Sequence, residues 1–130
     1  MNRNLMALAG VTLALLATSC KEGPTAGELN VNLMSPFGDG AIQFVANATA
    51  PAVITGVSSA CTGCKLFFAK VSDNQYKGVL TGPIVAGTIF RVGVSDTKIR
   101  GSYAVTIQAV ADRSYGMRNS LTGYSLTLAP

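Results

Sequence analysis

The stretch Tyr103-Ala-Val-Thr-Ile-Gln-Ala-Val110 alternates apolar and polar side chains with a period of two residues. In an extended strand the two kinds fall on opposite faces, with Tyr103, Val105, Ile107 and Ala109 on one face and Thr106 and Gln108 on the other. Such alternation is typical of a strand that buries one face in a core and turns the other to water. The stretch therefore predicts an antiparallel sheet that is covered on one side.

Similar strand-like segments recur along the chain between turn-forming residues. Turn signals include Thr81-Gly82-Pro83 and Asp96-Thr97. Strands are expected at residues 28–34, 41–48, 53–59, 65–71, 76–80, 88–94, 103–110 and 124–128. Short strands at this spacing predict an all-β fold, an antiparallel β-sandwich of about seven to nine strands in one domain over residues 28–130.

The same region resembles known bacterial modules in its arrangement of strands and of turns rich in Gly, Ser and Asn. Residues 28–130 are similar in this respect to cohesin-type and other Ig-like sandwiches. The resemblance implies a non-catalytic module that binds a partner, and it is an analogy at the level of the fold.

Composition excludes several classes of function. The 130 residues carry ten Lys and Arg against six Asp and Glu, and 12% are charged, about half of the usual share. This sparse charge argues against nucleic-acid binding. The chain has no His, which removes Ser-His-Asp triads and nearly every catalytic zinc site. We therefore expect no catalytic residues, no cofactor and no metal site, and we do not expect an enzyme.

The N-terminal segment has the composition of a secretion signal. Arg3 precedes the uncharged apolar run 5–17, which is too short to span the roughly 30 Å of a bilayer core. The run ends in Leu16-Ala17-Thr18-Ser19-Cys20, which resembles the lipobox of bacterial lipoproteins. The resemblance implies that residues 1–19 are a signal peptide, that cleavage falls between Ser19 and Cys20, and that Cys20 carries the lipid.

A lipid on Cys20 would make membrane lipid a partner and place the protein in the cell envelope. Residues 20–27 would then be the lipidated cysteine and a tether. Because Lys21 stands where Asp would favour inner-membrane retention, the resemblance implies the outer membrane where the host has one, and otherwise the outer face of the plasma membrane. The alternatives are a plain signal peptide and an uncleaved N-terminal anchor.

The remaining cysteines, Cys61 and Cys64, are expected to form a structural disulfide at the tip of a hairpin. The alternatives are free thiols, a thiol–disulfide redox pair and a metal site shared with a partner. Four aspartates stand where turns are expected to begin and should accept hydrogen bonds from turn amides: Asp39, Asp73, Asp96 and Asp112.

The longest irregular stretch, residues 112–123, is a candidate binding loop. It carries Arg113, Tyr115 and Arg118, which could contact a protein or a sugar. The alternative is a solvated loop whose tyrosines pack against the sandwich. Three functions follow from the sequence: a lipoprotein module that binds an envelope protein or glycan, a purely structural envelope protein, and a redox factor that uses Cys61 and Cys64.

Overall fold

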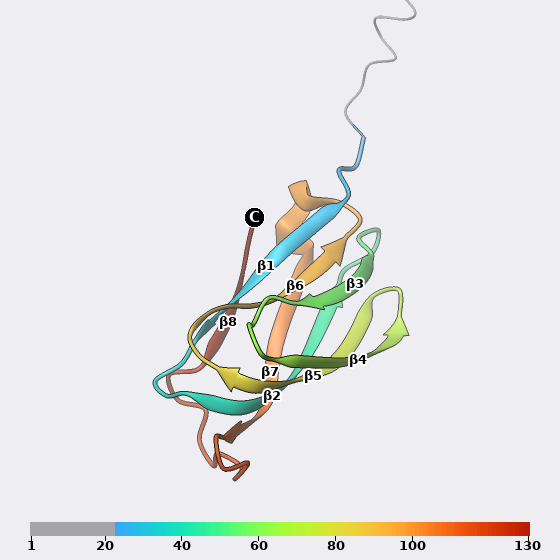
Figure 1. The fold of residues 1–130 in the computed structure, drawn as a ribbon. Coiled ribbons are helices and arrows are strands. Elements are labelled where there is room, and N and C mark those ends of the chain that lie inside the picture. Colours follow the sequence, from blue (N-terminus) through green and yellow to red (C-terminus); the bar gives the residue numbers. More distant parts are fainter. Residues whose placement is uncertain (1–22) are drawn as a thin grey trace, which may run out of the picture.

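The computed structural model describes residues 23–130, which form eight strands and one short 3₁₀ helix (Figure 1). The elements are β1 Gly27–Met34, β2 Asp39–Ala48, β3 Ile54–Ser59, β4 Lys65–Ser72, β5 Gln75–Ile84, β6 Gly87–Val94, η1 Thr97–Ser102, β7 Tyr103–Asp112 and β8 Ser125–Ala129. The predicted all-β sandwich is confirmed, since two antiparallel four-stranded sheets pack face to face. Sheet A has the order β3-β6-β1-β8, and sheet B has the order β4-β5-β2-β7.

Aromatic stacking joins the two sheets at the centre of the core. Phe44 of sheet B and Phe90 of sheet A are both fully buried, and their ring centroids lie 4.1 Å apart. Gly78 makes room for this pair, because a Cβ atom at that position would lie 2.5 Å from the Phe44 ring. The core is therefore packed tightly enough that one added methyl group would force the aromatic pair to move.

The strand pairing places both ends of the described chain at one end of the sandwich. Gly27 at the start of β1 pairs with Val94 at the end of β6, and Asn30 pairs with Ala129 of β8. Figure 1 shows the C-terminus beside the start of β1, and the β7–β8 loop at the opposite end. We call these the tether end and the loop end.

Strand β5 extends further than the sequence predicts, since it was expected to end at residue 80. Thr81-Gly82-Pro83 was expected to be a turn, but β5 continues through it to Ile84. The register between β2 and β5 shifts here, and Gly82 has a φ of 138°, in a region that favours glycine. A side chain at Gly82 would also meet the backbone of Cys64, at 2.8 Å from its Cα atom. Gly82 therefore allows a bulge inside β5 and does not form a turn.

The alternation in β7 is interrupted by a second bulge. Phe44 pairs with Ile107 but Gln43 pairs with Ala109, so Gln108 is the extra residue. Beyond it the core-facing residue is Val110, which is 1% exposed. Ala109 was expected on the core face with Ile107, and that expectation was wrong, because the bulge turns Ala109 to the outside.

Part of the expected tether is hydrogen-bonded to the domain. The amide of Thr25 donates to Oδ1 of Asp96 at 3.2 Å, and the amide of Thr97 donates to the Thr25 carbonyl at 2.8 Å. Asp96 also caps η1 by accepting from the Lys98 amide at 3.0 Å. Cys20 and the expected signal peptide lie outside the described residues. Within residues 23–130, no helix is both long and apolar enough to cross a membrane.

Candidate functional site: the outer faces of the sandwich

The outer face of sheet A is mostly polar and is cross-linked by side chains, with Met34 at the end of β1 as its large exposed apolar residue. Thr88 donates to Oδ1 of Asn32 at 2.6 Å, and Nε of Arg91 donates to Oδ1 of Asn30 at 3.1 Å. Each of these bonds joins β6 to β1 across the strand register. This surface therefore satisfies its own polar groups and is well suited to contact with water.

The outer face of sheet B, which we call the B face, carries an apolar patch at its centre, although Lys65 and Lys77 lie on the same face. Strand pairing sets four residues in one row across it, Phe67 of β4, Val79 of β5, Gln43 of β2 and Ala109 of β7. Two shallow hollows of about 320 Å³ and about 150 Å³ share Gln43 and Val79, so they lie next to each other on the sheet, and we call the pair the trough. The small side chain of Ala109 lies on this face because of the bulge at Gln108.

The β7–β8 loop closes one end of this trough. Its residue Met117 forms an isolated β-bridge with Ala111 of β7, and the neighbouring Arg118 amide donates to the Val110 carbonyl at 2.9 Å. Met117 lines the smaller hollow and is 65% exposed. The loop thus lies along the edge of sheet B as a short additional strand and extends its apolar face.

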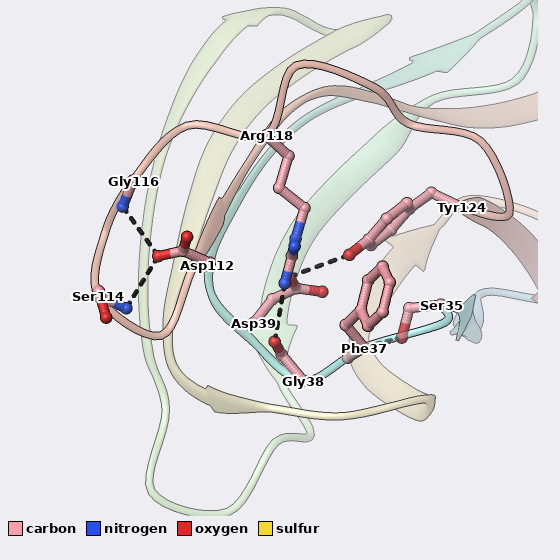
Figure 2. Close-up of polar contacts among 9 residues, drawn as sticks. All are labelled: Ser35, Phe37, Gly38, Asp39, Asp112, Ser114, Gly116, Arg118 and Tyr124. Atoms are coloured by element: carbon pink, nitrogen blue, oxygen red, sulfur yellow. Dashed lines mark hydrogen bonds and ion pairs between the residues drawn. The ribbon is translucent and has the colours of Figure 1, made fainter.

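Arg118 points inward and anchors the loop to the β1–β2 turn (Figure 2). Its Nε atom donates to Oδ1 of Asp39 at 2.6 Å, and its Nη2 atom donates to the Gly38 carbonyl at 3.1 Å. The Tyr124 hydroxyl donates to the same carboxylate oxygen at 3.1 Å. Because Met117 and Arg118 are consecutive in an extended segment, the inward ion pair fixes the outward position of Met117.

The electrostatics of this cluster follow from the burial of Asp39, whose exposed fraction is 0%. The hydrogen bond to Asp39 raises the pKa of Arg118. Burial, and then the hydrogen bond to Asp39, raises the pKa of Tyr124 above its usual 10.0. The guanidinium carbon of Arg118 also lies 4.9 Å from the centroid of the Phe37 ring. Asp39 was expected to cap a turn, and that expectation was wrong, because it is the buried anion of an ion-paired cluster.

Two of the other aspartates act as turn caps, as expected. Oδ1 of Asp112 accepts from the amides of Ser114 and Gly116, each at 2.9 Å (Figure 2). Asp96 caps η1 in the same way, and these backbone hydrogen bonds lower the pKa of Asp96. Asp73 instead pairs with Nζ of Lys70 at 2.8 Å, and this contact lowers the pKa of Asp73.

The structure separates the three residues of the candidate binding loop. Arg118 is committed to Asp39, whereas Arg113 and Tyr115 are exposed. Tyr115 has a φ of 64°, a left-handed conformation that bulky residues seldom adopt, and its side chain is 64% exposed. The B face was not among the sites expected from the sequence, although the run Leu66-Phe67-Phe68-Ala69 lacks the alternation of a half-covered strand and indicates an apolar outer surface.

Cys61 and Cys64 form a disulfide. It lies between β3 of sheet A and β4 of sheet B, so the expected hairpin tip is in fact a crossover between the sheets. Both cysteines are partly buried and pack against the core. The disulfide therefore closes the connection that turns the chain from one layer to the other.

Comparison with known proteins gives no relative, because no family model, no curated protein and no solved structure matches this chain. Within residues 23–130, no group of three or more His, Cys, Asp or Glu residues is positioned to hold a metal ion.

Proposed function

We propose that the protein is a lipid-anchored, non-catalytic β-sandwich module of the cell envelope that binds a protein partner through its B face. The observation that carries the proposal is the contrast between the two outer faces. Sheet A turns hydrogen-bonded polar side chains to the outside, whereas on sheet B the exposed Phe67 and the partly buried Val79, together with Met117 of the β7–β8 loop, line the trough. Contiguous apolar surface of this kind is typical of an interaction site.

The chemistry of the trough favours a polypeptide over a glycan. Its polar groups are few, and Nε2 of Gln43 already lies 3.5 Å from Oε1 of Gln108. A sugar needs a dense set of donors and acceptors, because its hydroxyl groups lose their water on binding. A protein with apolar side chains gains more from contact with Phe67 and Val79.

The proposed anchor and the proposed binding face are compatible in space. Only Lys21 and Glu22 separate Cys20 from Gly23, and three extended residues reach about 10 Å. Thr25 is already hydrogen-bonded at the tether end. A lipid on Cys20 would therefore hold the tether end near the bilayer and leave the loop end, with Met117, pointing away from it.

The anchor and the binding face are tested separately. Mass spectrometry of the processed N-terminus should find a lipidated Cys20, and the Cys20→Ser variant should leave the membrane fraction. An unmodified N-terminus at another residue would contradict the anchor.

For the B face, affinity capture from the host envelope is compared among the wild type, a Val79→Ser/Met117→Ser variant and an Asn32→Ser control on sheet A. A partner retained by the control and lost with the double variant supports the proposal, whereas a partner retained by all three overturns it.

The thiol–disulfide alternative depends on the Cys61–Cys64 disulfide, which is equally compatible with a structural role. With Cys61 and Cys64 first reduced to thiols by an added dithiol, a redox factor would transfer these two electrons to a disulfide-bonded model substrate and return to its own disulfide, and the activity would disappear in Cys64→Ser. Capture through the B face should be unaffected by the same substitution, so the two functions give opposite results with this variant.

A further inference from the structure

Strand β4 has the sequence of a covered strand but lies uncovered at the edge of sheet B. Its run Leu66-Phe67-Phe68-Ala69 is apolar on both faces, a pattern typical of strands with covers on both sides. Yet Phe67 on the outer side and Phe68 on the inner side are 61% and 51% exposed, and Val71 is 56% exposed. Among residues 23–130, β5 is the one strand that pairs with β4 (Figure 1).

The second edge of β4 offers backbone groups to another strand. An edge strand carries a row of peptide N–H and C=O groups without ladder partners, and proteins usually protect such edges with proline, charge or a bulge. The protective features of β4 lie at its two ends, Lys65 at one and Lys70 with the register shift before Ser72 at the other, so the apolar run between them has none of its own. The combination of an open edge and exposed aromatic rings on both faces fits one more strand.

The charge around this edge specifies the added strand further. Lys65 and Lys77 are exposed and share the outer side of the sheet with Phe67, as the pairings of β4 with β5 show. None of the five acidic residues within 23–130 lines the larger hollow. We propose that β4 binds an extended peptide segment with alternating acidic and apolar side chains, which adds to sheet B as a further antiparallel or parallel strand. This proposal rests on the proposed function and names its partner class.

The same observations disfavour two other occupants. A membrane would cover the rings of Phe67 and Phe68, but it would leave the backbone groups of the β4 edge without partners in an apolar medium, which is costly. A second copy would gather the lysines of both β4–β5 hairpins at one seam. Antiparallel pairing of two β4 strands would also reverse one sandwich relative to the other. The two tether ends would then point in opposite directions, and both could not lie at the same membrane. A peptide that supplies both carboxylates and backbone groups avoids these costs.

The test uses fluorescence anisotropy with the processed protein and labelled peptides as long as β4. The probe alternates valine and glutamate, one control alternates valine and lysine, and another is the glutamate peptide with alternate backbone amides methylated. We expect the glutamate peptide to bind at least tenfold more tightly than either control. The Phe67→Ser/Phe68→Ser variant should lose at least tenfold in affinity, and the matched Thr88→Ser variant on sheet A should lose none. Raising the salt concentration should weaken binding, because Lys65 and Lys77 contribute electrostatically.

Several outcomes would overturn the proposal. These are no peptide binding up to millimolar concentration, equal binding of both charge types, or binding that methylation does not reduce. If the protein sediments as a dimer and the Phe67→Ser variant sediments as a monomer, the occupant of β4 is a second copy of the chain instead. Co-sedimentation of the Cys20→Ser protein with phosphatidylglycerol vesicles, lost in the Phe67→Ser/Phe68→Ser background, would identify a membrane. If envelope capture still depends on Val79 and Met117 while no peptide binds, only this inference fails and the proposed function stands.

Discussion

The two outer faces of the sandwich have the same number of strands but differ in the side chains at their centres. On sheet A, Asn30 and Asn32 alternate with buried core residues and bond to Arg91 and Thr88. On sheet B, β4 presents Phe67 to the outside, and the bulge in β7 adds Ala109. Both faces are compatible with the fold, since the core lies between the sheets. Because the core lies between the sheets, we infer that the apolar side chains of the B face serve a purpose other than folding.

The largest expected effect separates the inner from the outer side of sheet B. Phe44→Ala removes half of the stacked pair at the centre of the core and should lower the free energy of unfolding by about 3–5 kcal/mol. Phe67→Ala, on the same sheet but facing outward, should change it by less than about 0.5 kcal/mol. Urea unfolding of the two variants with the disulfide intact measures both. A large loss with Phe67→Ala would mean that the B face stabilises the fold, and the comparison would fail.

The next effect concerns the cluster that positions Met117. Arg118→Met keeps the apolar stem of the side chain but leaves the buried carboxylate of Asp39 without its cation. The Oδ2 atom of Asp39 already has no hydrogen-bond partner among the described residues. An uncompensated buried carboxylate costs on the order of 3 kcal/mol, so stability should fall by about that much. Arg91→Met on sheet A is the matched control and should have a small effect, because its hydrogen bond to Asn30 is exposed. Similar losses in both variants would show that the cluster does not hold the loop.

The smallest effect is expected at the tether end, which belongs to neither face. Backbone hydrogen bonds from Lys98 and Thr25 hold the pKa of Asp96 below its usual 3.8. The stabilisation from Asp96 is therefore present above about pH 4 and is lost as pH falls through the lowered pKa. NMR titration should show the amides of Thr25 and Lys98 shifting together in this range while the Val79 and Asn32 amides stay in place. The Asp96→Asn variant should remove the transition, and a shift that persists there would assign it to another group.

The sequence predicted the parts of the fold that depend on local patterns. Alternation such as that in β1 marks a half-covered strand, and the Cys61–Cys64 spacing predicted the disulfide that the structure contains. Gly82 was misinterpreted because glycine serves a turn and a strand bulge for the same reason, its tolerance of positive φ. The bulge at Gln108 could not be predicted from the sequence either, since a bulge depends on the register with the neighbouring strand.

The candidate site depended still more on contacts between distant residues. Arg118 was expected in a binding loop, but its partner Asp39 is 79 residues away in the chain, and only folding brings the two side chains together. The exposure of Phe67 and Phe68 likewise follows from the position of β4 at the edge of sheet B. Their apolar side chains are equally consistent with a buried strand, so strand order alone makes them a surface.

The sequence by itself therefore determined that this chain forms a two-layer β-sandwich, because the period of two between apolar residues is a local property of an extended backbone. Tertiary structure decided which strand lies at an edge, which aspartate is buried and which face stays apolar. These properties depend on the order in which strands pair, and strand order is set by the packing of the whole core. The B face and the open edge of β4 follow from this strand order.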